Sequence, residues 1–329
     1  MKAIAYRAFG PARDVLRLVE MDSAPPGPGE VVVDLSLSGV NPSDVKARAG
    51  ARAGVTELPF PEIVPHSDGA GVISAVGAGV PGERIGERVW IWNGQWRRPF
   101  GTAAQQITLP ADQAAALPEG ISMETGACLG IPGMTAAHCV FAAGDVAGRT
   151  VLVQGGAGTV GFLAVQLARW GGARVIATAR GAGIDRVRTA GADAVLDYAA
   201  PDLAARILAA NDGAPVDRIV EVEFGLNAAT DAEVIAENGR ICAYGSARDM
   251  TPALPFYPLM FKAVTLELAL VYILTPAQRL AAQMRLADAL VAGALSCPVD
   301  AVFDLPDCAA AHEAVEAGGR SGAVLLRTA

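Results

Sequence analysis

The chain has 329 residues, of which 52% are hydrophobic and 18% charged, and its formal net charge is −8. This composition supports a sizeable core in two domains and excludes a disordered chain. Because the charge is negative and no basic cluster occurs, nucleic acid is not an expected partner.

Nothing along the chain indicates export or insertion into a membrane. The N-terminal residues 1–7 run directly into a strand-like pattern without the apolar core of a signal peptide. The longest apolar run, 263–274, contains Glu267 and is too short to span a bilayer. The five cysteines show no C-x-x-C spacing, which is typical of free thiols in a reducing compartment. We therefore expect a soluble cytoplasmic protein.

Residues 1–122 are expected to be rich in β-structure. Short apolar runs are separated by turn residues rich in Gly and Pro, which is typical of strands. The expected strands cover 31–40, 69–77, 86–92 and 104–109. Strands this short and frequent favour a partly open antiparallel barrel.

A glycine-rich turn between a strand and a helix is the most informative pattern in the chain. The expected strand 151–153 is followed by this turn, by a helix over 162–170 and by a strand over 173–179. Gly156, Gly158 and Gly161 fit G-x-G-x-x-G, in which glycines permit the turn, the approach of a pyrophosphate and close packing of helix on strand. With Ala157, Thr159 and Val160 they would place backbone N–H groups on the phosphates of a dinucleotide.

The end of the second strand bears on which dinucleotide binds. An NAD site needs a carboxylate about 20 residues past the turn, but Ala177, Thr178 and Ala179 supply none, and Arg180 follows. A guanidinium can bind two oxygens of a 2′-phosphate. The sequence therefore predicts NADPH, although Arg180 alone could also be an ordinary solvated loop residue.

Helices and strands continue to alternate after this unit, as in a doubly wound parallel sheet. The expected helices cover 184–191 and 203–210, and the expected strands 194–197, 219–222 and 240–245. The tail adds a helix over 276–292 and strands over 299–305 and 323–327. We expect 123–265 to form the cofactor domain, inserted in a catalytic domain made of 1–122 and 266–329.

Several blocks in this order resemble the medium-chain dehydrogenase/reductase superfamily, and within it the zinc-free NADPH:quinone reductase (zeta-crystallin-like) branch. Besides the glycine turn, the matching blocks are 39–44, 48–50, 66–72, 130–136, 238–240 and 321–322. The resemblance implies an α/β protein with a GroES-like partly open β-barrel catalytic domain and a Rossmann domain. It also implies a cleft between the two domains and a homodimer, for which the apolar segment 263–272 is the candidate edge.

The resemblance also implies that no metal takes part. Zinc-dependent relatives have a cysteine where this chain has Val40 or Asn41, and Ser67 stands at the position of their zinc histidine. Without three ligands no catalytic zinc is expected. His66, one residue early, occupies a position that is usually glycine, where it could be a packed or solvated turn residue or could act at the substrate.

Three residues of the first domain are implied as catalytic. Asn41 would polarise the acceptor oxygen next to the nicotinamide, or would only cap the turn before Pro42. Asp44 would bond the cofactor amide or ribose, or would be an acid at a helix start. Lys46 stands where known relatives carry a tyrosine; it could attract the acceptor or be solvated.

Further cofactor contacts follow from the resemblance. Thr135 would face the nicotinamide or its ribose, and Tyr198 would help to hold the 2′-phosphate. Gly245 and Ser246 end a strand at the edge of the sheet where ligands of such folds lie. Gly322 would form a turn near the cofactor. Each of these residues could instead have only a packing or turn role.

The function implied is reduction of a quinone by hydride or electron transfer from NADPH, without a metal. One alternative is an NADPH-dependent reductase of enone or alkenal double bonds on the same scaffold, so the expected substrate is a quinone or an α,β-unsaturated carbonyl compound. An alternative of another class is an NADPH-binding sensor or structural protein with little catalysis.

Overall fold

The computed structural model describes residues 1–52 and 54–329 and divides into two compact units. The first unit contains Met1–Ile131 and Cys297–Ala329, and the second contains Pro132–Ser296. These boundaries differ from those expected from sequence, because residues 266–296 belong with the second unit and residues 123–131 with the first. Strand β13 (Thr265–Leu268) pairs with β12 (Ile235–Ala243), and helix α10 (Pro276–Val291) packs on α4 (Met134–Phe141).

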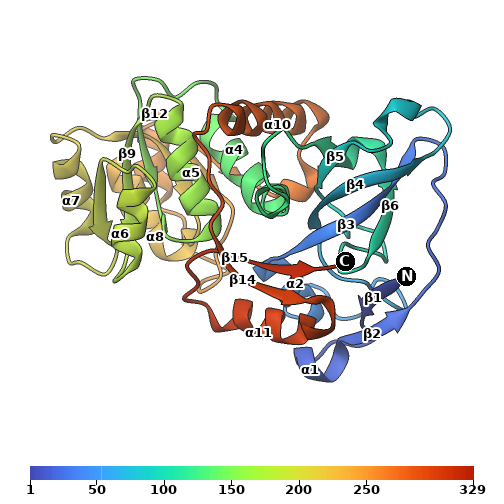
Figure 1. Ribbon diagram of the computed structural model, residues 1–329. Helices are drawn as coiled ribbons and strands as arrows, with labels where there is room; N and C mark the ends of the chain where they lie inside the picture. Colours follow the sequence, from blue (N-terminus) through green and yellow to red (C-terminus); the bar gives the residue numbers. More distant parts are fainter. Residues whose placement is uncertain (53) are drawn as a thin grey trace. The chain divides into compact units, whose positions relative to one another are not determined.

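The first unit is built on a seven-stranded sheet around the long strand β3 (Glu30–Val40). One side of β3 pairs with β4 along most of its length, while the other side pairs with β6 at its start and with β15 at its end. Figure 1 shows the C-terminal strands β14 and β15 beside the blue β3. The remaining strands are β1 (Lys2–Ala5), β2 (Arg17–Glu20), β4 (Asp68–Val76), β5 (Arg88–Ile91), β6 (Gln106–Pro110), β7 (Ala114–Ala116), β14 (Val299–Asp304) and β15 (Ala323–Arg327).

Alternating apolar residues of these strands form the core of the first unit. Val31, Val33 and Leu35 of β3 are buried with residues of β4, β5 and β6. A second cluster lies beneath helix α11, which contributes Cys308, Ala311 and Val315. The helices of this unit are α1 (Ala12–Val15), α2 (Pro42–Arg48), α3 (Met123–Gly126) and α11 (Cys308–Ala317).

The second unit contains a six-stranded parallel sheet in the order β10-β9-β8-β11-β12-β13. This is the strand order 3-2-1-4-5-6 of a doubly wound dinucleotide-binding sheet, so the predicted fold class is confirmed. Its remaining strands are β8 (Thr150–Val153), β9 (Arg174–Ala179), β10 (Ala194–Asp197) and β11 (Val216–Glu221).

Helices pack on the apolar strands of this sheet. Helix α4 packs against both α5 and α10, which lie beside it in Figure 1. Residues of α7 and α8 share a buried cluster with Leu152, Ile176 and Ile219 of the sheet. The remaining helices are α5 (Thr159–Trp170), α6 (Gly183–Thr189), α7 (Leu203–Ala210), α8 (Phe224–Val234) and α9 (Phe256–Phe261).

Among the described residues, every helix is too short or too polar to cross a lipid bilayer. The apolar run 263–274, expected from sequence to be too short for a span, consists of β13 and the 3₁₀ turn Val271–Ile273.

Candidate cofactor and catalytic site

The glycine turn lies between β8 and α5, as the sequence predicts. Helix α5 begins at Thr159 with Gly158 as its N-cap, three residues earlier than expected. The N–H groups of the first turn, from Thr159 to Gly161, have no carbonyl partner within the helix. Because no acidic residue occupies that turn, it offers a favourable place for phosphate.

Two glycines of this turn differ in what a side chain would meet. A Cβ on Gly161 would lie 2.4 Å from the Gly155 carbonyl oxygen, so the protein's own packing demands glycine there. A Cβ on Gly158 would meet only that oxygen, at 3.5 Å, which is an ordinary contact. The small size of Gly158 is therefore not required by the protein interior, as expected where a ligand approaches the backbone.

Thr178 supports the turn from below instead of facing outward. It is buried at the end of β9, where its Oγ1 accepts a hydrogen bond from the Gly155 N–H at 3.0 Å. The same hydroxyl donates to Gln154 Oε1 at 2.7 Å, and Gln154 Nε2 donates to Asp231 Oδ1 at 3.0 Å. Sequence reasoning missed Gln154 and Asp231, because their polar groups meet only when strands β8 and β9 and helix α8 are assembled.

Two carboxyl groups are buried at this end of the sheet. Glu221 closes β11, and Asp231 lies on α8, with both side chains inaccessible to solvent. Burial raises the pKa of Glu221, and burial together with the nearby Glu221 raises the pKa of Asp231 well above its usual value. Asn227 Nδ2 donates to Glu221 Oε1 at 3.1 Å, so polar groups line this wall of the site.

The end of β9 carries a cation and no acid. Arg180 is exposed directly after β9, and Tyr198 is 49% exposed after β10. The Tyr198 N–H donates to the Ala179 carbonyl, which brings the two loops together. The adjacent Asp197 carboxylate accepts the Ala199 N–H at 2.8 Å and so is engaged in its own loop. This arrangement suits a 2′-phosphate better than a free ribose hydroxyl.

The other predicted cofactor residues are placed as follows. Ser246 accepts a hydrogen bond from the Gly225 N–H at 2.9 Å and donates to the Asp249 carbonyl, so it closes the loop after β12. A Cβ on Gly245 would meet the Val222 carbonyl oxygen at 2.4 Å. Thr135 is buried on α4. In the first unit, Gly322 is buried, and a Cβ on it would lie 2.4 Å from the Pro298 carbonyl oxygen.

Asn41 connects two buried carboxyl groups in the first unit. It is the N-cap of α2, and its backbone N–H donates to Asp44 Oδ2 at 2.8 Å. Its side-chain Nδ2 donates to Asp68 Oδ2 at 2.7 Å, while Asp68 Oδ1 accepts the Ile131 N–H at 2.8 Å. A Cβ on Gly130 would overlap Asp68, so glycine there lets the carboxyl approach.

Burial controls the charge of these two acids. Burial raises the pKa of Asp44 to about 7, against the effect of its hydrogen bond from Asn41. Burial also raises the pKa of Asp68 well above its usual value, although the Ile131 N–H bond opposes this. The amide of Asn41 has two hydrogens, and Asp68 takes one of them. The helix-start roles considered for Asn41 and Asp44 are confirmed, and their roles at the acceptor and the cofactor stay predictions. Asp68 is a further residue that the sequence did not single out.

Lys46 and His66 are placed differently. Lys46 is exposed on α2. His66 is 1% exposed with φ of 77°, and its Nε2 lies 2.9 Å from His312 Nε2. A solvated turn role for His66 is therefore wrong, because the C-terminal helix α11 covers it.

Comparisons with known proteins agree with this architecture. Two family models match: "Alcohol dehydrogenase GroES-like domain" over residues 27–148 and "Zinc-binding dehydrogenase" over residues 159–287. The rat quinone oxidoreductase is 32% identical over 252 residues, covering 74% of this chain and 73% of that protein. The human synaptic vesicle membrane protein VAT-1 homolog is 30% identical over 257 residues. The match covers 76% of this chain but only 62% of the human protein. A mycobacterial protein solved with NADPH superposes with a TM-score of 0.85 at 29% identity, covering 99% of this chain and 100% of that one.

Proposed function

Because this chain belongs to the medium-chain dehydrogenase/reductase superfamily, in its quinone oxidoreductase branch, we propose that it reduces quinones with NADPH. One observation carries the cofactor assignment: a glycine turn with room for a ligand at Gly158 stands beside a strand end that carries Arg180 and no acid. The name of the rat relative supplies the acceptor class.

NADPH, when bound, supplies a hydride from its nicotinamide ring. The residues of this chain bind and orient it. The N–H groups from Thr159 to Gly161 would hold the pyrophosphate, and Arg180 with Tyr198 would bind the 2′-phosphate. Thr178 holds the turn from below through Gly155.

Asn41 is proposed to polarise the acceptor. Its Nδ2 has a second hydrogen that can point at the quinone oxygen, while the bond to Asp68 fixes the amide plane. Asp44 fixes the backbone of Asn41 through its N–H. Five further residues are proposed to complete the contacts with the acceptor and the cofactor: Lys46, Thr135, Gly245, Ser246 and Gly322. The proton for the reduced quinone would come from solvent.

Steady-state turnover on two acceptor panels tests this proposal. Oxidation of NADPH is followed with a series of quinones and with a matched series of 2-alkenals. Higher kcat/KM on quinones is expected. A clear preference for 2-alkenals would assign a double-bond reductase, and tight NADPH binding without turnover of either panel would assign a binding protein.

Catalysis is also proposed to be independent of zinc, since Val40 or Asn41 stands where zinc-dependent relatives have a cysteine ligand and Ser67 where they have a histidine. Retained activity after dialysis against a chelator tests this. A cytoplasmic location is proposed because all five cysteines are free. Fractionation of the cells that express the chain would test that location.

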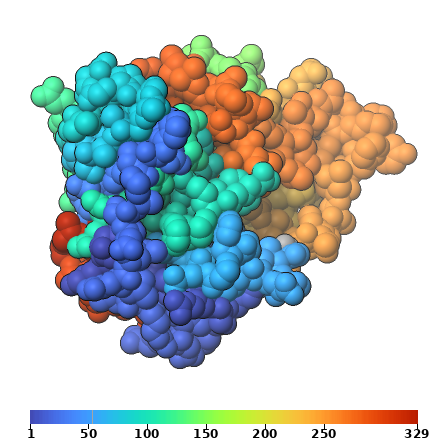
Figure 2. Space-filling view, turned by 90° about the vertical axis from the view of Figure 1, so that its right-hand side faces the viewer, coloured from blue at the N-terminus to red at the C-terminus, as the bar shows by residue number. Residues whose placement is uncertain are grey.

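A homodimer is proposed through the surface of the second unit formed by α9, β13 and the residues after it. Strand β13 is the last strand of its sheet, so one edge has no partner strand. The residues of this surface, from α9 to the end of the 3₁₀ turn Val271–Ile273, are coloured orange in Figure 2. Six large apolar side chains of this surface are exposed by 45–78%: Phe256, Tyr257, Phe261, Leu268, Leu270 and Ile273. Apolar exposure on this scale marks an interaction surface.

A further inference from the structure

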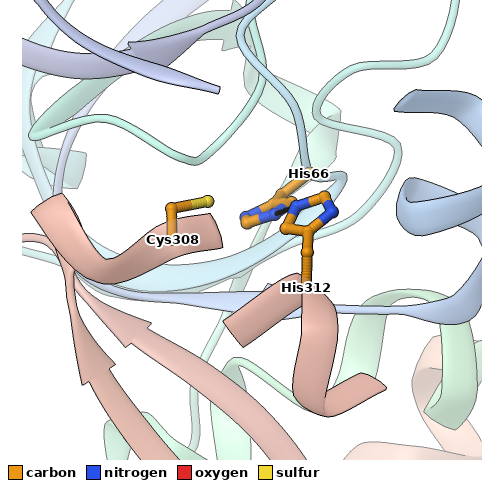
Figure 3. A group of neighbouring side chains, drawn as sticks. All are labelled: His66, Cys308 and His312. Atoms are coloured by element: carbon orange, nitrogen blue, oxygen red, sulfur yellow. Dashed lines mark hydrogen bonds between the residues drawn. The ribbon is translucent and has the colours of Figure 1, made fainter. Parts of the chain in front are cut away.

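Three side chains that can bind a metal converge in the core of the first unit. His66 lies just before β4, whereas Cys308 and His312 lie one turn apart on the same face of α11. All three are buried, and one ligand atom from each lies within 4.8 Å of the others. Figure 3 shows the Cys308 sulfur pointing toward the two imidazoles.

A hydrogen-bond chain fixes the tautomer of His66. Thr102 Oγ1 donates its only hydrogen to the Asp68 carbonyl at 2.5 Å, so Ser38 must donate to Thr102 across 2.8 Å. Ser38 then accepts from His66 Nδ1 at 2.9 Å. His66 Nε2 is therefore an unprotonated lone pair directed at His312. A metal-bound histidine has this same arrangement, with its second nitrogen held by a hydrogen bond.

His312 has a second ring nitrogen, Nδ1, that can take the proton when Nε2 becomes a ligand. Without a metal its Nε2–H donates to His66 Nε2 at 2.9 Å. Its Nδ1 is buried without a hydrogen-bond partner among the described residues. The proton can therefore move to Nδ1 when Nε2 becomes a ligand. Burial lowers the pKa of His312 to about 3 and lowers that of His66, so both rings are neutral at physiological pH.

The backbone of His66 is a second, independent observation. Its φ of 77° lies in the left-handed region, which costs a residue other than glycine about 1 kcal/mol or more. Glycine would adopt this conformation without strain. This backbone conformation accompanies a ring whose Nε2 lies 2.9 Å from His312 Nε2.

We propose that His66, Cys308 and His312 form a binding site for one Cu(I) ion. Soft thiolate suits Cu(I), imidazole also suits copper, and three ligands can complete the coordination of Cu(I) without water. The three ligand atoms, which lie within 4.8 Å of one another, would rearrange around one ion. On binding, Cys308 forms an S–Cu bond and releases its thiol proton to solvent, with no change in oxidation state.

The surrounding charges favour a monovalent ion over Zn²⁺. Cu⁺ and the Cys308 thiolate sum to zero, whereas Zn²⁺ would leave a buried positive charge. Arg48, itself only 1% exposed, is close by and is neutralised by its ion pair with Glu316. Burial and the charge of Asp44 raise the pKa of the Cys308 thiol, but burial raises the pKa of Asp44 itself to about 7, which limits that charge. Zinc sites also prefer four ligands, and the cluster offers three.

A second group, His138, Cys242 and Glu267, does not carry the same inference. His138 Nε2 bonds to Glu267 Oε1 at 2.6 Å, and Arg240 pairs with the same carboxylate. The charges of that group are already compensated within the protein.

Anaerobic competition with the chelator bicinchoninate tests the site on the full chain, purified from copper-supplemented cells. We expect one Cu(I) per chain and an X-ray absorption spectrum of two nitrogens and one sulfur. Cys308→Ser and His312→Gln should each weaken binding by about 100-fold or more, and Ser38→Ala by about 10-fold. Cys297→Ser, which removes a half-buried thiol outside the cluster, is the matched control and should bind as the parent does.

Circular dichroism melting of each variant shows whether it is folded. His66→Asn, whose side chain tolerates a positive φ, gives a variant that should fold but lose copper. Cu(I) binding that is equal in the parent and Cys308→Ser would overturn the proposal. So would zinc bound one to one that Cu(I) does not displace, or no Cu(I) retained against the chelator. None of these readouts depends on the quinone reductase reaction.

Discussion

The side-chain amide of Asn41 donates to the carboxyl group of Asp68 across 2.7 Å, with both residues buried. This contact joins the start of α2 to the start of β4 and fixes the plane of the amide. If that amide polarises the quinone oxygen, Asn41→Ala should lower kcat/KM for the quinone by about 10- to 100-fold. Asp68→Asn should act in the same direction to a smaller extent.

Steady-state kinetics and NADPH titration check this prediction. The Kd for NADPH should change less than about twofold, since the cofactor phosphates are held elsewhere. Asp34→Asn, an exposed acid of β3, is the control and should leave kcat/KM unchanged. An Asn41→Ala enzyme with full quinone turnover would refute the polarising role.

The two glycines of the turn should respond differently to alanine. Gly158→Ala should keep the melting temperature, because its Cβ meets only an ordinary contact, but should lose NADPH binding because the methyl group occupies the phosphate's approach. Gly161→Ala should lose about 1–3 kcal/mol of stability, because its Cβ would lie 2.4 Å from the Gly155 oxygen. Calorimetry of unfolding and of NADPH binding separates the two effects. Normal NADPH affinity in Gly158→Ala would show that the pyrophosphate lies elsewhere.

Replacing Arg180 should change cofactor preference. Arg180→Ala should weaken NADPH binding by about tenfold, because a charge-assisted contact to the 2′-phosphate is lost, and should leave NADH almost unaffected. Arg188→Ala removes an exposed cation on the following helix α6 and serves as the control. Equal losses for NADPH and NADH in Arg180→Ala would rule out its contact with the 2′-phosphate.

Stability should depend on pH through Asp44. The folded pKa is about 7 and the usual value 3.8, so between these values the folded chain keeps a proton that the unfolded chain has released. Raising the pH from about 4 to about 7 therefore lowers the free energy of unfolding, by at most about 4 kcal/mol from this group. Urea unfolding of Asp44→Asn should show a smaller decrease, while the exposed control Asp22→Asn should follow the parent. Identical pH profiles for the parent and Asp44→Asn would contradict the raised pKa.

A charge on the proposed dimer surface should separate the subunits. Leu268 of β13 is 74% exposed, and Leu268→Glu would bury a carboxylate in the interface. Sedimentation should find a dimer for the parent chain and a monomer for this variant. Val291→Glu, at a position 75% exposed on α10, is the control. A monomeric parent chain would remove the proposal.

The sequence predicted those parts of the fold that are local in the chain. The glycine turn lies with β8, α5 and β9 within the 30 consecutive residues 150–179. The local sequence pattern was therefore enough to predict this unit correctly. The placement of 266–296 failed because β13 and α10 carry no mark of the sheet or helix that they join. The pairing of β13 with β12 and the packing of α10 on α4 show it.

The side-chain clusters could not be predicted for the same reason. Asn41 and Asp68 are 27 residues apart, and His66 and His312 are 246 apart. A local sequence pattern identifies the types of residue present, but it does not show which residues far apart in the chain come into contact. His66 at a position usual for glycine was the only signal of the histidine pair that the sequence offered.

The ratio of kcat/KM for NADPH to that for NADH, measured with one quinone on the parent chain, tests the central claim most directly. It examines the cofactor site and the reaction together. We predict turnover with both cofactors measurable and NADPH preferred by about tenfold or more. Equal or better turnover with NADH, or no quinone reduction with either cofactor, would contradict the account.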